Sequence, residues 1–322
     1  MLKRIVLVAA LAFAGAAAAQ EFPTRPVTMV VPFAAGGPID VLGRILQPAL
    51  GEALGQPVVI ENVSGGGGMT GSNRVRQAAP DGYQVVLGSI GTHTLSPLLA
   101  KQPLYDPATD FAPVILVAEI PLVLLVRKDL PAQDLQGFIA YLKANHAKMQ
   151  FGSGGTGTSS HVGCVLLGQA LGVNVTHIPY RGGGPALNDL IAGRLDYICN
   201  YISLAVQAVE TGHVRALAIF ARERAAVMPS LPTAAEQGLK GVDAYTWNAI
   251  FAPKGTPPAV VARLNAAVSR ALDTPAVEER LAKLGLDIPS KEHRTPEYLG
   301  RYVVSEMARW AAPVRASGAG EE

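Results

Sequence analysis

The sequence predicts an α/β fold divided into two domains, and three observations support this. Short apolar runs rich in β-branched residues alternate with segments of helical periodicity, a pattern typical of mainly parallel sheets flanked by helices. The length of 322 residues exceeds what one small core needs. Hydrophobic residues make up 49% of the chain and charged residues only 16%, so the interior should be large.

The expected strands are short apolar runs bounded by Gly, Pro or polar turn residues. They are residues 27–31, 58–60, 85–87, 114–118, 122–126, 150–151, 173–177, 195–198, 216–220 and 249–252. Helical patterns fall between them, at residues 39–54, 70–78, 135–144, 160–171, 185–192, 204–211 and 233–237. The C-terminal part is helical instead, because three segments begin near a proline, which the first turn of a helix tolerates. These helices are residues 257–272, 275–284 and 296–310.

The N-terminus has the pattern of a secretory signal peptide. A basic start at Lys3 and Arg4 precedes an uncharged apolar run over residues 5–16, and small residues lead to an expected cleavage after Ala19. The apolar run is too short for a typical membrane-spanning helix. We therefore expect residues 1–19 to be removed and the mature protein to be soluble and exported.

Charge argues against a nucleic-acid partner. Removal of Lys3 and Arg4 lowers the count of Lys and Arg from 27 to the same value as the 25 Asp and Glu residues. A nucleic-acid-binding protein normally needs a basic surface, and a chain without net charge does not favour one.

The two cysteines are Cys164 and Cys199. An exported protein meets an oxidising compartment, where an even pair can form a disulfide. Two buried free thiols are the alternative, and the sequence leaves both open.

Glycine-rich segments follow several of the expected strands, at the sheet edge where α/β folds bind ligands. The first, residues 33–40, joins a strand to a helix. Gly36 and Gly37 allow a close backbone approach, and the start of the helix offers unpaired N–H groups and a positive dipole end to an anion. Residues 152–160 repeat the arrangement, so we expect a carboxylate to be held between two domains. The other such segments are residues 65–71, 88–94 and 180–185.

A dinucleotide cofactor is not expected. Two glycine sets match the G-x-G-x-x-G pattern: Gly66, Gly68 and Gly71, and Gly152, Gly154 and Gly157. The pattern also requires an acidic residue about 20 positions later to hold the ribose. Those positions are Gly91 and His177, with no carboxylate nearby, so we expect no cofactor.

Catalysis and metal binding find little support. Ser159, Ser160 and His161 contain a nucleophile and a base, but no G-x-S-x-G elbow surrounds them, and adjacent residues of a helix point apart. A capped helix start explains them better. The histidines lack the spacing of a zinc site, so we expect neither an enzyme nor a metal protein.

Three further residues have alternative interpretations. Arg181 follows a strand and can pair with a ligand carboxylate or with a protein carboxylate such as Asp189, and we favour the protein partner. Trp247 and Asn248 lie where the chain crosses between the domains, and Trp247 either lines the cleft or packs the junction.

An ordered set of fragments identifies a resemblance. The fragments are VPFAAGGPID, GQPVVIEN, GGGGMTGSN, APDGY, YDPATDFAPV, GTSSH, HIPYRGGGPALNDLIAG and FAPKGTP. Together they resemble the periplasmic solute receptors of tripartite tricarboxylate transporters, known as Bug receptors. The resemblance extends from residue 22 to the C-terminus.

The resemblance implies a two-lobed, hinged periplasmic binding protein. Residues 20–121 and 246–322 would form the first lobe, and residues 122–245 the second. The mature protein would be a periplasmic monomer that delivers a small carboxylate to integral-membrane transporter subunits. A sensor subunit that signals to a kinase is the alternative, and an enzyme on the same fold is a weaker one because the sequence offers no nucleophile–base pair.

The family also implies a set of ligand-binding residues. Backbone amides and water on the first loop would hold the carboxylate, with Asp40 as helix cap and water organiser. The residues carried over are Phe33, Ala34, Ala35, Gly36, Gly37, Pro38, Asp40, Ser89, Thr92, Gly155, Thr156, Thr158, Ser159 and Asn200. The chain departs from the family in having Ile39 where Thr or Ser is frequent and Ser96 where Asn is frequent. Ile39 indicates a more apolar ligand environment.

Overall fold

A mixed sheet of nine strands organises the fold, as the computed structural model shows for residues 22–221, 223–242 and 244–316. The strand order is β2-β1-β3-β9-β4-β7-β5-β6, and β8 pairs with β4. The expected signal peptide and its cleavage after Ala19 lie outside the described residues. The strands are β1 (Val27–Val31), β2 (Val58–Asn62), β3 (Gln84–Ser89), β4 (Phe111–Arg127), β5 (Gln150–Ser153), β6 (Thr176–Pro179), β7 (Tyr197–Tyr201), β8 (Val214–Ile219) and β9 (Tyr245–Pro253).

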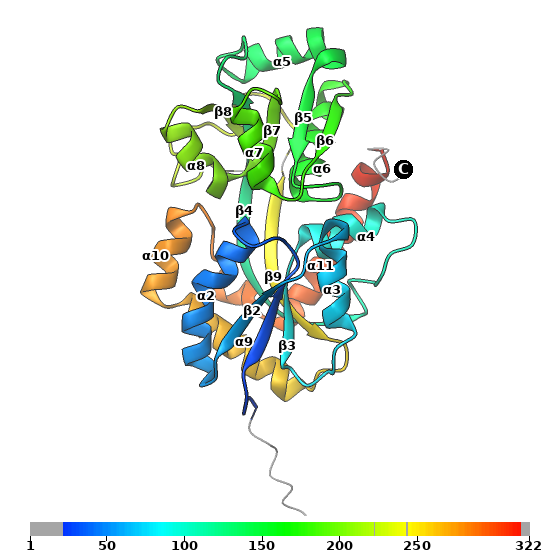
Figure 1. The fold of residues 1–322 in the computed structure, drawn as a ribbon, viewed down its shortest axis with the longest axis vertical. Helices are drawn as coiled ribbons and strands as arrows, with labels where there is room; N and C mark the ends of the chain where they lie inside the picture. Colours follow the sequence, from blue (N-terminus) through cyan, green and yellow to red (C-terminus); the bar gives the residue numbers. More distant parts are fainter. Residues whose placement is uncertain (1–21, 222, 243, 317–322) are drawn as a thin grey trace, which may run out of the picture.

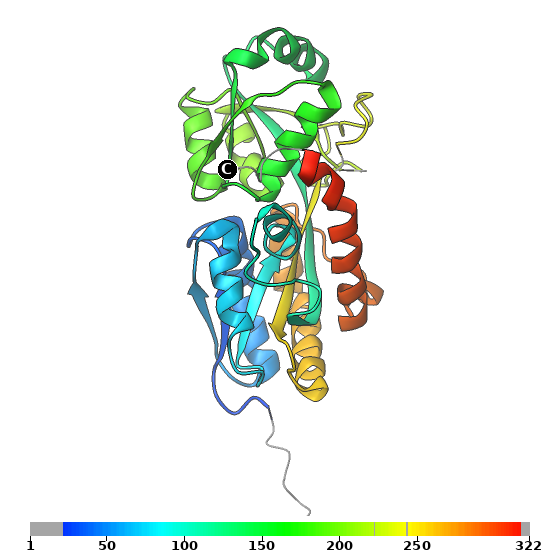
Figure 2. The same cartoon turned by 90° about the vertical axis from the view of Figure 1, so that its right-hand side faces the viewer.

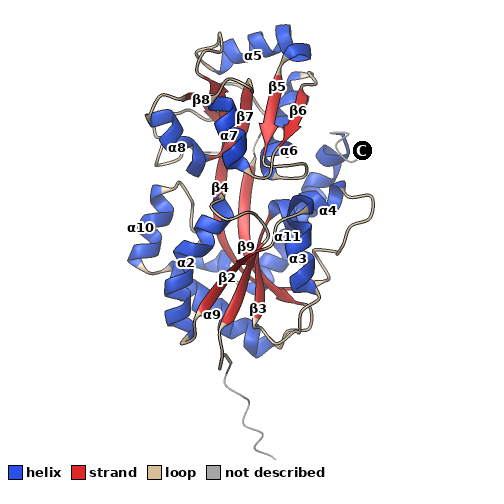
Figure 3. Cartoon of the chain, viewed as in Figure 1, coloured by secondary structure: helices blue, strands red, loops and turns tan. Residues whose placement is uncertain are grey.

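Helices flank this sheet on both sides (Figure 3). They are α2 (Pro38–Leu54), α3 (Met69–Arg76), α4 (Ser96–Leu99), α5 (Leu135–Asn145), α6 (Ser159–Leu171), α7 (Gly183–Ile191), α8 (Ile202–Glu210), α9 (Pro258–Leu272), α10 (Pro275–Lys283) and α11 (Pro296–Ala316). None of the helices in the described part of the chain combines the length and apolar character that a membrane crossing requires.

The elements gather into two lobes, one above the other in Figures 1 and 2. The first lobe is built on the parallel strands β1, β2 and β3, and the second on the parallel strands β5, β6 and β7. All the antiparallel pairs involve β4 or β9. The expected α/β class with two lobes is therefore confirmed, whereas the residue limits of the lobes stay a prediction.

The long strand β4 runs through both lobes. It pairs with β9 from Phe111 to Pro121 and with β7 from Leu122 to Val126. The sequence predicted two strands here, and that was wrong. Pro121, which cannot donate a backbone hydrogen bond, stands where β4 changes partners, so the strand continues through it.

Three other predicted elements differ in the structure, and the first is the strand predicted at residues 173–177, which is displaced to β6 at Thr176–Pro179. The predicted helix at residues 233–237 is a turn, in which Glu236 accepts from the backbone N–H of Thr233 at 2.7 Å and Thr233 Oγ1 accepts from the N–H of Glu236 at 3.1 Å. This reciprocal pair is a capping box, but Gly238 with a φ of 85° ends the turn at once. The predicted loop at residues 88–94 contains a π-helical turn, Gly91–Leu95, that continues into α4.

The crossover strand β9 is buried against the C-terminal helix α11. Trp247 is 0% exposed, and its indole N–H donates to Glu306 Oε2 at 3.3 Å. Asn248 is also buried and donates from Nδ2 to the carbonyl of Gly88. Trp247 therefore packs the junction of the lobes and does not line the cleft.

Candidate functional site

A pocket of about 210 Å³ lies between the two lobes. The first lobe contributes the loop between β1 and α2, and the second lobe contributes three separate segments. The lining residues are Phe33, Ala34, Ala35, Gly36, Gly37, Pro38, Ile39, Gly154, Thr158, Ser160, Arg181, Gly182, Gly183, Gly184, Pro185, Tyr201 and Leu204.

The β1–α2 loop lines the pocket with its backbone. Gly36 has a φ of 78°, a conformation that favours glycine, and its N–H donates to Asp40 Oδ2 at 2.8 Å. The N–H of Gly37 donates to the carbonyl of Ala34 at 3.3 Å. No protein acceptor within the described residues meets the N–H of Ile39. The start of α2 thus keeps donor capacity for an anion.

Asp40 supports this loop from behind. It is 2% exposed, does not line the pocket, and accepts from Arg44 Nε and Asn62 Nδ2 at 2.9 Å each as well as from Gly36. Burial alone would raise the pKa of Asp40, but the hydrogen bonds from Arg44, Gly36 and Asn62 together lower it below its usual value. The charge of the Asp40 carboxylate is neutralised by these protein partners, so Asp40 organises the loop without repelling an anionic ligand.

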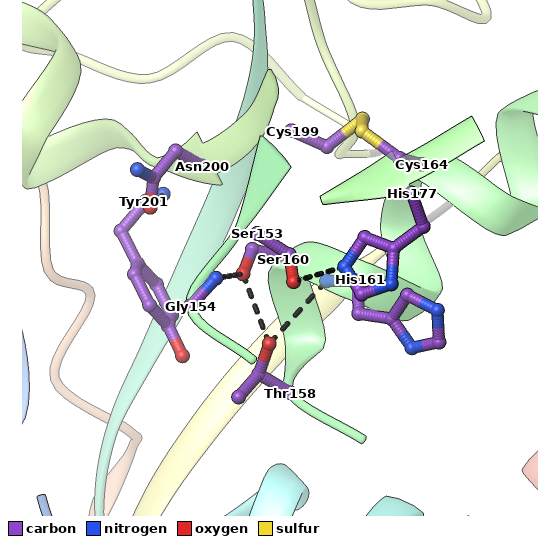
Figure 4. Close-up of a disulfide and its surroundings, with 10 residues drawn as sticks. All are labelled: Ser153, Gly154, Thr158, Ser160, His161, Cys164, His177, Cys199, Asn200 and Tyr201. Carbon is purple, nitrogen blue, oxygen red and sulfur yellow. Dashed lines mark hydrogen bonds between the residues drawn. A yellow bond between two sulfur atoms is a disulfide. The ribbon is translucent and has the colours of Figure 1, made fainter. Parts of the chain in front are cut away.

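The start of α6 forms the first part of the second-lobe wall (Figure 4). Thr158 Oγ1 accepts from the N–H of His161 at 3.4 Å, and Ser160 Oγ accepts from the N–H of Gly154 at 2.9 Å. Thr158 and Ser160 line the pocket, whereas Gly155, Thr156 and Ser159 do not. Ser159 turns toward β9 and donates to Thr246 Oγ1 at 2.9 Å.

The start of α7 contributes five consecutive lining residues, 181–185. Asn200 lies beneath it, donates from Nδ2 to the carbonyl of Gly183 at 3.1 Å, and accepts at Oδ1 from the N–H of Tyr201. A Cβ on Gly183 would lie 2.7 Å from Asn200 Oδ1, so any side chain there would displace the Asn200 amide. Asn200 therefore positions the wall and does not line it.

Arg181 does not have the protein partner that the sequence favoured. Asp189 is paired with Arg194 and accepts from the hydroxyl of Tyr180. Arg181 is exposed, lines the pocket, and forms no ion pair or hydrogen bond within the part of the chain that the structure describes. The prediction of an Arg181–Asp189 pair was wrong because Arg194, just beyond the end of α7, pairs with that carboxylate instead.

Four helices begin at the pocket. The first-turn or capping residues of α2, α6, α7 and α8 all contribute to its lining. Helix N-termini carry partial positive charge, and fields from several elements add in a partly enclosed cleft. Burial raises the pKa of the Tyr201 hydroxyl, so it stays neutral. The electrostatics favour an anionic ligand.

Ser89 and Thr92 lie deeper in the first lobe. Thr92 Oγ1 accepts from the N–H of Ser89 at 2.9 Å, and both side chains are buried outside the pocket lining. Their hydrogen bonds close the turn at the end of β3, which places the nearby Ser96. Ser96 Oγ lies 3.2 Å from the carbonyl of Gly67 in the first lobe and 3.3 Å from that of Gly157 in the second.

Two histidines stack behind the second-lobe wall. The rings of His161 and His177 are 4.1 Å apart, and His177 Nε2 lies 2.6 Å from Ser153 Oγ. Burial lowers the pKa of His161 to about 3 and that of His177 to about 4, so both are neutral at neutral pH. Nδ1 of His161 accepts from the N–H of Gly157, which supports the capped helix start that the sequence favoured.

A disulfide joins Cys164 of α6 to Cys199 of β7, with Cα atoms 5.4 Å apart (Figure 4). The choice left open by the sequence is thereby settled in favour of the disulfide. It fastens the helix capped by Thr158 to the strand that ends at Tyr201, so both pocket-lining segments have a fixed relation. Among the described residues, no three His, Cys, Asp or Glu side chains gather as metal ligands would.

Comparison with known proteins places the chain in a family. The model of the tripartite tricarboxylate transporter family receptor, TctC, matches residues 42–318. The chain belongs to this receptor family. The protein BugT of Bordetella pertussis is 34% identical over 316 residues, which covers 98% of this chain and 96% of BugT.

Two solved structures of the same type have similar folds. MatC from Rhodopseudomonas palustris with bound malate is 44% identical, has a TM-score of 0.87, and covers 91% of this chain and 100% of MatC. A second R. palustris protein, with adipate, is 34% identical with a TM-score of 0.87, and covers 92% of this chain and 99% of its own. The resemblance found in the sequence fragments is therefore confirmed.

Several lining residues were not in the predicted set of ligand-binding residues, although Ile39 and Arg181 were considered on sequence grounds. They are Ile39, Gly154, Ser160, Arg181, Gly182, Gly183, Gly184, Pro185, Tyr201 and Leu204. The glycine run at 182–184, directly before a helix, was the signal for the largest group. It follows β6, and the sequence alone does not show which strand ends lie beside it.

Proposed function

We propose that this protein is a periplasmic receptor that captures a small carboxylate between its lobes and presents it to the membrane subunits of a tripartite transporter. The observation that carries the proposal is the pocket itself, where four helix starts and Arg181 supply donors and positive potential. The family assignment supports the transport role, and relatives bound to malate and adipate support the carboxylate.

The mechanism is capture by lobe closure. Residues 20–121 and 246–322 form one lobe and residues 122–245 the other, joined through β4 and β9. A carboxylate first meets the β1–α2 loop, where backbone donors substitute for water. The second lobe then closes over the ligand, and the membrane subunits recognise the closed form. The protein performs no chemistry on the ligand, which leaves as it entered.

The test is a thermal-shift screen of the mature protein from Gln20 onward, unfolded and refolded beforehand to remove any copurified ligand. A ligand that binds only the folded state adds about 2.7 kcal/mol to the free energy of unfolding when its concentration is 100 times its Kd. The melting temperature rises as a consequence. We expect a shift with a subset of small carboxylates and none with neutral amides of the same skeleton. A flat response to every carboxylate would contradict the proposal.

A further inference from the structure

Arg181 is the one charged residue among those that line the pocket. It stands at the second-lobe wall, directly before the glycine run that starts α7. Asp189, the carboxylate expected to neutralise it, is engaged by Arg194 and Tyr180. Arg181 therefore brings an unneutralised guanidinium to the pocket, as far as the described residues show.

The pocket has two separate surfaces suited to an anion, one on each lobe. On the first lobe, the β1–α2 loop and the start of α2 offer backbone donors. On the second lobe, Arg181 stands beside the start of α7, where the N–H of Gly184 has no acceptor within the described residues. The lining also includes the apolar side chains of Phe33 and Ile39 from the first lobe and Leu204 from the second.

This arrangement fits a ligand with a negative group at each end and an apolar middle. A single carboxylate satisfies one lobe and leaves the other surface facing methyl or methylene groups. Two carboxylates satisfy both lobes, and closure then removes water from around the second ion pair, which strengthens it. A guanidinium is also the side chain best matched to a carboxylate, because its planar fork donates two parallel hydrogen bonds.

We propose that Arg181 binds the second carboxylate of a dicarboxylate whose first carboxylate lies on the β1–α2 loop, and that it thereby makes the receptor selective for dicarboxylates over monocarboxylates. The inference rests on the proposed function as a carboxylate receptor. It assigns the selectivity to a single side chain of the second lobe, while the first lobe recognises any carboxylate.

The experiment measures affinities by isothermal titration calorimetry with two matched pairs of ligands. Adipate is compared with hexanoate, and malate with α-hydroxybutyrate, so that each pair differs by one carboxylate on an equal carbon chain. We expect Arg181→Ala to weaken binding of the preferred dicarboxylate roughly 10- to 100-fold, the range of a lost charge-assisted hydrogen bond. The affinity for the matched monocarboxylate should change less than about threefold, since that ligand leaves Arg181 unused.

Two further variants sharpen the result. Arg181→Lys keeps the charge but loses the fork, and should retain part of the selectivity. Arg224→Ala removes another arginine of the second lobe, one that pairs with Glu236 outside the pocket lining, and should leave both affinities unchanged. Because Arg181 is exposed, its variants should melt without ligand at the same temperature as the unaltered protein, which separates binding from folding.

The outcomes separate the inference from the proposed function. The role of Arg181 would be overturned if the unaltered protein bound both members of each pair equally well, or if it preferred the monocarboxylates. It would also be overturned if Arg181→Ala lost the same affinity for both members of a pair. Each of these results would leave the carboxylate receptor intact. Binding of no carboxylate in these pairs or in the wider thermal-shift screen would overturn both.

Discussion

At the scale of single residues, Asp40 holds the ligand-facing loop in shape. We expect Asp40→Asn to lower the free energy of unfolding by about 1–3 kcal/mol at pH 7, because the amide cannot accept from Gly36, Arg44 and Asn62 together. Urea denaturation measures the change. Asp129→Asn is the matched control, since Asp129 is 77% exposed and such surface pairs contribute about 0–1 kcal/mol.

The same residue gives a pH dependence with a definite sign. The folded-state pKa of Asp40 lies below its ordinary value of 3.8, so its carboxylate stabilises the folded protein above about pH 4 and ceases to do so as the pH falls through the folded-state value. The difference in unfolding free energy between Asp40→Asn and the unaltered protein should therefore shrink between pH 5 and about pH 2. A difference that stays constant over this range would show that charge is not its source.

The local sequence predicted the residues of the β1–α2 loop but did not show how the residues of the second lobe are placed. Gly36 and Gly37 were predicted as ligand-binding residues because two glycines between a strand and a helix let a ligand approach the backbone at a helix N-terminus, and this pattern is visible in the local sequence. Asn200 was predicted as part of the wall, but its amide lies beneath Gly183. That difference depends on the packing of β7 against the start of α7, which no local pattern encodes.

At the scale of elements, the disulfide between α6 and β7 fixes two walls of the pocket. It closes a segment with a sequence separation of 35 residues, and a loop of that size typically contributes about 2–4 kcal/mol. We expect reduction with a phosphine to lower the melting temperature and to weaken carboxylate binding, because the starts of α6 and α8 then lose their fixed relation.

The variant carrying both Cys164→Ser and Cys199→Ser provides the control for that measurement. It should match the reduced protein in melting temperature and show no further response to the phosphine. An unaltered melting temperature on complete reduction, with free thiols counted chemically, would contradict a stabilising role for the bond.

The elements themselves were largely predictable from periodicity. The order of strands and helices follows the apolar runs, and β1 has the predicted bounds of Val27–Val31. The failures have physical causes. Two strands were predicted at residues 114–118 and 122–126, yet Pro121 lies within the single strand β4 where the partner strand changes. Thr233 and Glu236 cap a turn that never becomes a helix, since a capping signal starts a helix but does not extend it.

At the scale of the whole molecule, Ser96 lies where the two lobes touch. Its hydroxyl is within hydrogen-bond distance of the carbonyls of Gly67 and Gly157, one from each lobe. We expect Ser96→Ala to favour the open form and to weaken carboxylate binding roughly 3- to 10-fold, the value of one neutral hydrogen bond. Calorimetry measures the affinity. Small-angle scattering of Ser96→Ala with saturating ligand should give the same radius of gyration as the closed form of the unaltered protein.

Ser305→Ala is the matched control for Ser96. Ser305 lies on α11 and donates to the carbonyl of Tyr302 in the same helix, so its removal should leave ligand affinity unchanged. Equal affinities for Ser96→Ala and the unaltered protein would mean that the Ser96 contact adds nothing to closure.

The fold of the whole molecule was anticipated more fully than its pocket. Composition, length and the ordered fragments together indicated two lobes, because these properties are spread along the chain. The pocket depends on which loops meet across the cleft. Arg181 and the glycines after it enter the pocket because β7, β5 and β6 are neighbours, and such long-range pairing leaves no trace in the local sequence.

The chain has two tryptophans, and both indole N–H groups donate to the same oxygen of Glu306, from Trp247 on β9 and Trp310 on α11. Each tryptophan residue is at most 3% exposed. All of the protein's indole fluorescence therefore originates at one place, where the returning strand meets the C-terminal helix, and none of it comes from the ligand pocket. The tryptophan emission of this protein therefore monitors the environment at the junction of the lobes.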